Sequence, residues 1–147
     1  MKRIEKIFIG IDFAKEKFDA CYLDEDGVVA HAVFQNVKKD YGKLLSWVKK
    51  TSRVKGELDP AQVLFCGEHT GECSLPLSEW LVSSGYRIWL DNAVRIKRSA
   101  GIVRGKSDKA DAEMIATYAM EKYKPGKSRL FTPDSEAVKT LKALYYC

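Results

Sequence analysis

The sequence predicts an α/β fold in which a five-stranded mixed sheet carries helices on both faces. Three observations lead to this expectation: a hairpin pattern follows the first apolar run, a strand–helix–strand pattern spans residues 62–90, and amphipathic segments separate the strands. The length of 147 residues fits one domain and is sufficient to bury most of the apolar surface that the unfolded chain exposes.

Three antiparallel strands are expected first. Residues 7–11 are apolar except for Gly10, which is typical of a strand buried on both faces. Residues 17–36 give two further strands, joined at an acidic turn that ends in Gly27. Because an ionised carboxylate is costly at the end of a buried strand, Asp12 must be stabilised by a helix cap, a cation or a catalytic metal.

Helices and two parallel strands follow. Residues 38–53 predict an amphipathic helix that ends near Gly56. Residues 62–67 and 86–90 predict strands, and residues 73–84 predict the helix between them, which implies a right-handed parallel crossover. A short helix should break near residues 101–105, and a longer one should cover residues 107–123 before Pro125 and Gly126.

The last residues begin like another helix, with Thr132 as its cap and Pro133 at its first position. An apolar stripe follows at helical spacing: Val138, Leu141, Leu144 and Tyr145. Such a stripe either packs on its own domain or belongs to a surface that a longer protein or a partner chain continues.

Composition narrows the function classes. The net charge of +5 and the pI near 9.0 favour polyanionic partners such as nucleic acid. No apolar run is long enough to cross a membrane. The four cysteines lack a CxxC spacing, so we expect free thiols in a reducing cytoplasm rather than a zinc site built on Cys66, His69 and Cys73.

Four acidic residues can meet at one edge of this sheet. The predicted order of elements is the ribonuclease H-like arrangement, which places the first strand beside the fourth, so that Asp12 and Glu68 end neighbouring strands. Asp108 and Asp111 open the last long helix three residues apart and project from one face, and the alanines behind them allow close approach to the sheet.

Converging carboxylates repel one another, so this pattern favours a site for Mg²⁺ (or Mn²⁺), which prefers oxygen ligands. Two such ions about 4 Å apart can act on a phosphodiester. Each acid also has a structural alternative: Asp12 can cap a turn, Glu68 can pair with a lysine, and the other two can neutralise a helix N-terminus.

Basic residues surround the expected site. They can hold a phosphate backbone or form a solvated surface: Lys15, Arg95, Lys97, Arg98, Arg104, Lys106 and Lys109. His69 can assist proton transfer or make a structural hydrogen bond.

Three motifs carry a resemblance to a known family: GIDFAKEKFDA at 10–20, EHTG at 68–71 and GKSDKADAEMIATYA at 105–119. They resemble the DEDD transposases and Piv invertases of bacterial insertion sequences (the insertion sequence one-ten group), and the resemblance covers nearly the whole chain. It implies a RuvC-like domain in which Asp12, Glu68, Asp108 and Asp111 bind magnesium for DNA strand cleavage and transfer.

The resemblance also implies parts that the sequence does not contain. Residues 1–126 would form the RuvC-like catalytic domain, and residues 127–147 would be a linker and the start of a helical connector to an absent C-terminal domain with a serine nucleophile. The implied partners are DNA, a guide RNA and further copies of the full-length protein, in the bacterial cytoplasm.

Two other functions are open from the residues alone. The same fold houses sugar kinases and chaperone ATPases, which also place an Asp on the first strand but need glycine-rich phosphate loops that are not found here. A non-catalytic module that binds nucleic acid or protein is the other alternative, and it predicts DNA binding that survives removal of all four acids.

Overall fold

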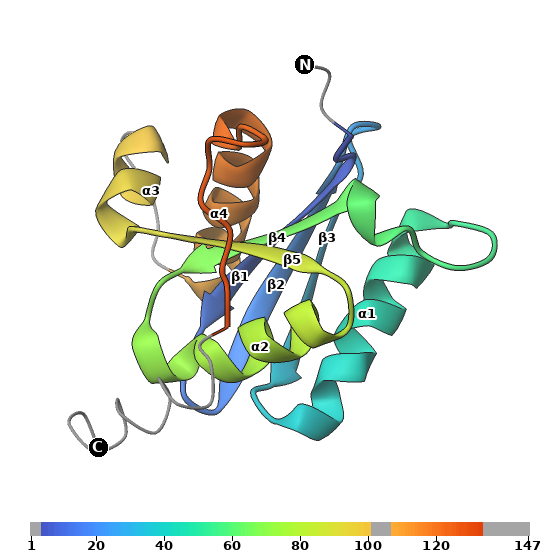
Figure 1. Cartoon of the computed structure of the whole chain (residues 1–147), viewed down its shortest axis with the longest axis horizontal. Coiled ribbons are helices and arrows are strands. Elements are labelled where there is room, and N and C mark those ends of the chain that lie inside the picture. Colours follow the sequence, from blue (N-terminus) through green and yellow to red (C-terminus); the bar gives the residue numbers. More distant parts are fainter. Residues whose placement is uncertain (1–3, 101–106, 134–147) are drawn as a thin grey trace.

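The computed structural model describes residues 4–100 and 107–133, and its centre is a five-stranded sheet in the order β3-β2-β1-β4-β5 (Figure 1). The strands are β1 (Ile7–Phe13), β2 (Lys17–Asp24), β3 (Val29–Gln35), β4 (Val63–Glu68) and β5 (Arg87–Asp91). The helices are α1 (Lys38–Ser52), α2 (Leu75–Ser83), α3 (Ala93–Ala100) and α4 (Asp108–Lys122), with short 3₁₀ turns at Pro60–Gln62 and Gly71–Cys73.

The strand order confirms the ribonuclease H-like prediction. β1 pairs antiparallel with β2 and parallel with β4, so it lies in the middle of the sheet. β3 and β5 form the two edges, and β5 pairs parallel with β4 through the crossover that contains α2. The carboxyl ends of the parallel strands β1, β4 and β5 therefore lie side by side at one end of the sheet, which is where Asp12 and Glu68 lie.

Helices cover both faces of the sheet (Figure 1). On one face, α1 and α2 bury a core that includes Ile9, Phe65 and Leu81. On the other face, α3 and α4 bury a second core around Phe8 and Trp89. Because β1 alternates its side chains between these two cores, it is buried on both faces, as its apolar sequence predicted.

The predicted elements are present with small shifts in their ends. α1 ends at Ser52 rather than near Gly56, because Arg53 adopts the left-handed conformation with φ of 57° and its N–H donates to the carbonyl of Lys50. The turn between β2 and β3 is held by the Asp24 carboxylate, which accepts hydrogen bonds from the N–H groups of Asp26 and Val28.

Gly10 brings α4 against the backbone of β1. A Cβ atom at this position would lie 2.2 Å from the carbonyl oxygen of Ala112 and 2.3 Å from the nitrogen of Ala116. Both alanines are fully buried, so the helix backbone packs directly on the strand. Only a glycine in β1 and small residues on α4 permit this distance, and it fixes where the first turn of α4 lies.

After α4 the chain returns to β5. The N–H of Phe131 donates to the carbonyl of Ile88, and Leu130 and Phe131 pack against the two cores. The apolar stripe predicted at Val138, Leu141, Leu144 and Tyr145 lies outside the described residues. Within the described parts of the chain, the helices are too short or too polar to cross a bilayer.

Gly10→Ala should destabilise the fold. The added methyl group meets backbone atoms that cannot rotate away, so we expect a loss of about 2–3 kcal/mol in the free energy of unfolding, measured by urea denaturation. Gly42→Ala is the matched control, since Gly42 lies in α1 with open space around its Cβ position and should gain about 0.5–1 kcal/mol. Equal stability of Gly10→Ala and the unsubstituted chain would contradict the close packing.

Candidate metal centre

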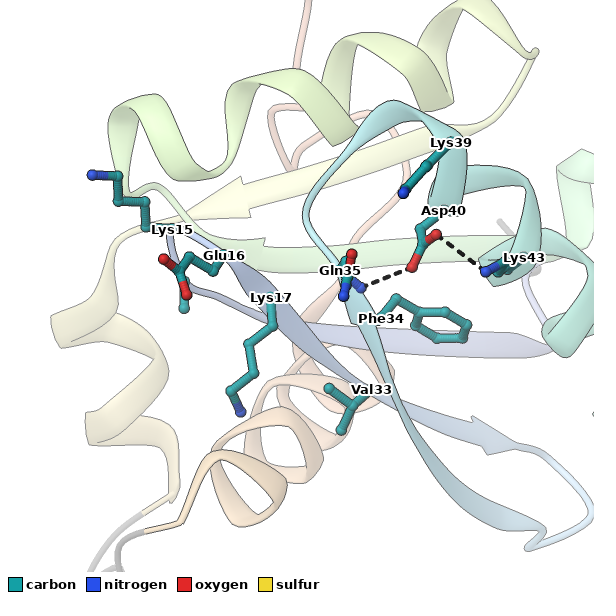
Figure 2. A pocket seen from close by; sticks show the side chains of 10 residues that line it. Lys15, Glu16, Lys17, Val33, Phe34, Gln35, Lys39, Asp40 and Lys43 are labelled. Atoms are coloured by element: carbon teal, nitrogen blue, oxygen red, sulfur yellow. Dashed lines mark hydrogen bonds and ion pairs between the residues drawn. The ribbon is translucent and has the colours of Figure 1, made fainter.

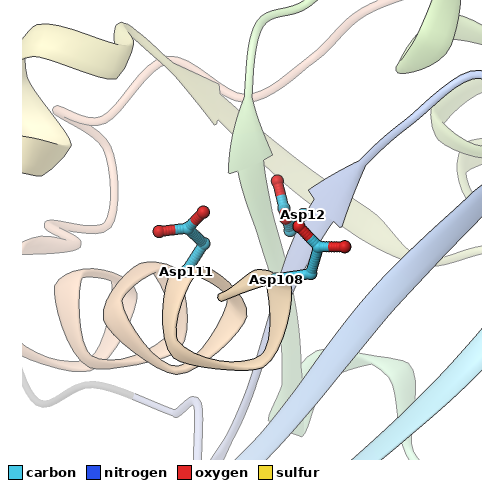
Figure 3. A group of neighbouring side chains, drawn as sticks. All are labelled: Asp12, Asp108 and Asp111. Carbon is cyan, nitrogen blue, oxygen red and sulfur yellow. The ribbon is translucent and has the colours of Figure 1, made fainter. Parts of the chain in front are cut away.

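Three aspartates converge at the carboxyl end of β1. Asp12 is the second-last residue of β1, and Asp108 and Asp111 lie in the first turn of α4. One carboxylate oxygen from each of the three lies within 4.8 Å of the other two. Figure 3 shows the two helical side chains on the side of α4 that faces the end of the strand. Of the four acids that the sequence predicts to converge, the structure brings these three together.

The local sequence explains how α4 presents its acids. Ser107 is the N-cap, and its hydroxyl accepts a hydrogen bond from the N–H of Ala110 at 3.1 Å. Asp108 and Asp111 are then three residues apart and project from the same face of the first turn, near the positive end of the helix dipole. The same turn therefore tolerates two negative charges side by side.

Asp12 is the most perturbed of these acids. Its pKa is raised from 3.8 to about 7, and burial is the largest cause. The rest comes from the charges of neighbouring carboxylates, in decreasing order: Asp111, Asp108, Glu68 and Asp19. Among the described residues, no hydrogen bond or salt bridge reaches the carboxylate of Asp12 or Asp111. Ionisation of Asp12 is therefore less favourable than that of an ordinary aspartate, and a cation beside it would favour the ionised form.

An acid lies near the same end of each of four neighbouring strands. Asp19 on β2 is directly opposite Asp12 on β1, and Glu68 on β4 is directly opposite Asp91 on β5. The parallel register pairs Ile11 with Gly67, which places Asp12 and Glu68 at equivalent positions on β1 and β4. This end of the sheet thus carries a row of four carboxylates, in the order Asp19, Asp12, Glu68 and Asp91.

Protein groups neutralise the two outer acids of this row. Lys17 donates to Asp19 at 3.0 Å, and the Tyr118 hydroxyl donates to Asp91, while Arg95 lies 3.7 Å from the same carboxylate. The inner acids, Asp12 and Glu68, have no such partner in the described part of the chain. The charge left without a protein partner is therefore concentrated at the centre of the row.

Lys17 links this row to α4. Its Nζ lies 2.8 Å from Oδ2 of Asp108 as well as 3.0 Å from Oδ2 of Asp19. Hydrogen bonds to Asp108 and then Asp19 are the main reasons why the pKa of Lys17 is raised above its usual value. A single ammonium group therefore balances part of the charge of two acids from different elements.

Glu68 takes a different place from the other three predicted ligands. It is half-buried and does not belong to the group of oxygens within 4.8 Å, although its charge contributes to the raised pKa of Asp12. His69, predicted as a proton-transfer or structural residue, is exposed, and its backbone N–H donates to the carbonyl of Asp91. Cys66 is fully buried in the core, as expected, while Cys73 is half-buried.

The predicted nucleic-acid-binding residues are exposed where the structure describes them. Arg95, Lys97 and Arg98 lie on α3, which packs against α4, and Lys109 lies in the first turn of α4. Lys15 is in the turn between β1 and β2. Arg104 and Lys106 lie outside the described residues. The described basic side chains therefore lie next to the aspartates, in the turn after β1 and in the first turn of α4, and on α3 after the edge strand β5.

Sequence reasoning missed Asp19, Asp91 and Lys17. Asp91 follows an apolar strand in the same way as Asp12 and Glu68, so the same pattern could have identified it. Asp19 lies inside an apolar run, and only the register of β1 with β2 places it opposite Asp12. Lys17 precedes this run without any local pattern that indicates its contact with Asp108, ninety-one residues later.

Comparison with known proteins identifies relatives. A family model described as a transposase, that of the DEDD transposases of the IS110 type, matches residues 9–146. The pilin gene-inverting proteins of Moraxella lacunata and Moraxella bovis are each 28% identical over 144 residues, which cover 96% of this chain. The match covers 41% of either relative, so the chain spans less than half their length. The resemblance carried by the sequence motifs is confirmed.

Asp12→Asn should stabilise the metal-free chain at high pH. Between about pH 4 and pH 7, the folded chain binds a proton at Asp12 that the unfolded chain has lost, so stability falls as the pH rises through this range. Because water partly screens the half-buried carboxylate, we expect the variant to gain about 1–2 kcal/mol at pH 8 in chelator, measured by urea denaturation. At pH 4 the gain should vanish.

The control for this comparison is Asp26→Asn. Asp26 lies exposed in the turn between β2 and β3, at the end of the sheet opposite to Asp12, Asp108 and Asp111. Its substitution should change stability equally at pH 4 and pH 8. A stability difference for Asp12→Asn that did not vary with pH would contradict the raised pKa of Asp12.

Proposed function

Because this chain belongs to the DEDD transposase family of the IS110 type, we propose that it supplies the metal-binding site at which such a protein cleaves and transfers DNA strands. Membership of the family supports a role in transposition or recombination. The relatives named as pilin gene-inverting proteins suggest DNA inversion as one form that this recombination takes. Since the chain spans 41% of their length, we propose it as one part of the recombinase.

The observation that carries this proposal is the meeting of Asp12, Asp108 and Asp111 within 4.8 Å. All three offer carboxylate oxygens, which are the ligands that hard divalent cations such as Mg²⁺ and Mn²⁺ prefer. Burial and then the charges of the neighbouring carboxylates raise the pKa of Asp12, and a bound cation would favour its ionised form. The donor set therefore fits a divalent metal.

We propose that Asp12, Asp108 and Asp111 hold the metal and that Glu68, on the adjacent strand, completes the four acids of the family's name. A bound divalent metal supplies Lewis-acid stabilisation of the oxygens at a phosphodiester. The protein's own groups position the substrate and balance charge. Lys17 holds Asp108 in place by a hydrogen bond. The Tyr118 hydroxyl donates to the Asp91 carboxylate, so that Asp91 does not compete with Glu68 for the metal.

The basic residues on the flanks complete the proposal. Arg95, Lys97 and Arg98 on α3, with Lys109 and Lys15 nearer the aspartates, would bind the phosphates of the DNA. We propose the same role for Arg104 and Lys106, which lie outside the described residues. Residues 1–126 would form the RuvC-like catalytic domain, and a guide RNA and further copies of the full-length protein are proposed partners.

Divalent metal binding tests this function. Titration of Mn²⁺ into the chain at pH 8, followed by calorimetry, should show binding that Asp12→Asn or Asp108→Asn weakens by at least about tenfold, since each removes an anionic ligand. Affinity should also fall as the pH drops below about 7, because the Asp12 carboxyl then holds a proton.

Asp26→Asn serves again as the matched control, because it removes one surface carboxylate far from the cluster. It should leave Mn²⁺ affinity within about twofold of the unsubstituted chain. Binding that is absent, or that all three variants reduce equally, would refute the metal centre and favour a non-catalytic nucleic-acid-binding module.

A further inference from the structure

A groove lined by lysines lies beside the aspartates. It has a volume of about 910 Å³ and runs between the turn after β1, the end of β3 and the start of α1. Figure 2 shows Lys15 and Lys17 on the side of the turn, with Lys39 and Lys43 on α1. Against these four lysines, Glu16 and Asp40 are the acids that line the groove. Its walls are therefore predominantly positive.

The buried acid of this groove, Asp40, already has partners within the chain. Asp40 is buried, and its carboxylate accepts a hydrogen bond from the N–H of Gln35 at 3.1 Å while Lys43 lies 3.2 Å from it. Lys15 and Lys39, by contrast, are exposed and make no hydrogen bond or salt bridge to any described residue. Lys39 still feels the charge of the neighbouring Asp40, but neither ammonium group is held by a hydrogen bond, so both can reach an anion from outside the chain.

Hydrogen bonds hold the walls of the groove together. Asp40 joins the start of α1 to the end of β3, and the Asn36 side-chain amide donates to the carbonyl of Ala14 at 2.9 Å. These contacts connect all three segments that form the groove. A ligand would therefore meet a preformed surface, which reduces the conformational entropy lost on binding.

The groove leads directly to the aspartates. Lys17 lines the groove, and its Nζ is the same group that contacts Asp108 at 2.8 Å. On the opposite side of the aspartates, α3 carries Arg95, Lys97 and Arg98. The carboxylates thus lie between two positive surfaces, one on α3 and one in the groove, which is the arrangement that a polyanion passing over them requires.

We infer that the groove binds the phosphate backbone of a single DNA strand next to the phosphodiester held at the aspartates. This inference rests on the proposed function, which makes DNA the polymer acted on there. The side chain of Val33 is 58% exposed in the groove, and Phe34 lies half-buried next to it. Val33 and Phe34 project from opposite faces of the edge strand β3, and Phe34 packs against Phe18 and Trp47, so the exposed Val33 is the apolar surface beside the lysines. The unpaired bases of a single strand can contact it, whereas those of a duplex are stacked inside the helix.

The test is the affinity of the 147-residue chain for a fluorescently labelled single-stranded DNA oligonucleotide, measured by anisotropy in chelator. Lys39→Ala combined with Lys43→Ala should weaken binding about five- to tenfold at 0.1 M salt and lower the slope of log affinity against log salt by about 1. Lys39→Ala alone keeps the Asp40–Lys43 pair intact and should give a smaller loss in the same direction.

Lys49→Ala combined with Lys50→Ala is the matched control, because it removes the same charge from the exposed last turn of the same helix. This control should change affinity less than twofold. Equal losses in the two double variants, or no DNA binding by the unsubstituted chain, would overturn the groove as a DNA site. So would a loss confined to single-stranded RNA of the same sequence.

The two proposals fail in different ways. Metal binding by the aspartates is read by Mn²⁺ titration without nucleic acid, whereas the groove is read by DNA binding without metal. A failed groove test alongside intact Mn²⁺ binding would leave the metal centre standing. If the groove variants weaken DNA binding but the chain binds no Mn²⁺, the groove stands as a DNA site and the proposed metal centre is refuted.

Discussion

The contact between Gly10 and the backbone of α4 is the constraint on which the candidate site depends. A Cβ at position 10 would overlap the carbonyl of Ala112, so the strand and the helix can be this close only because β1 has a glycine there. That distance brings Asp108 and Asp111, at the start of α4, within reach of Asp12, two residues after Gly10. Local backbone packing thus brings together three carboxylates from distant parts of the sequence.

The four carboxylates at this end of the sheet differ in whether a protein group contacts them. The outer acids have protein partners: Lys17 contacts Asp19, and Tyr118 and Arg95 contact Asp91. Burial, and then repulsion from the neighbouring carboxylates, raises the pKa of Asp12 to about 7. The acids at the ends of the row thus have protein partners, whereas the acid with the perturbed pKa lies at its centre, which is the pattern typical of functional sites.

Two positive surfaces lie on either side of the aspartates and define a path across them. α3 presents basic side chains at one flank, and the groove formed by the turn after β1, the end of β3 and the start of α1 presents lysines at the other. A strand that follows both surfaces must pass the aspartates. The net charge of +5 is therefore not spread evenly but is partly arranged around the acids that would act on a phosphodiester.

The sequence by itself determined the order of strands and helices, because apolar periodicity and turn residues act locally, and it determined that Asp12, Glu68, Asp108 and Asp111 end or begin elements. Only the tertiary structure decided which of these acids are neighbours. The close group contains Asp12, Asp108 and Asp111 but not Glu68, and the close packing of α4 on Gly10 brings the two helical aspartates to Asp12. The register of β2 placed Asp19 opposite Asp12, and the packing of α4 brought Lys17 to Asp108. Such pairings join residues far apart in sequence, so no local pattern encodes them.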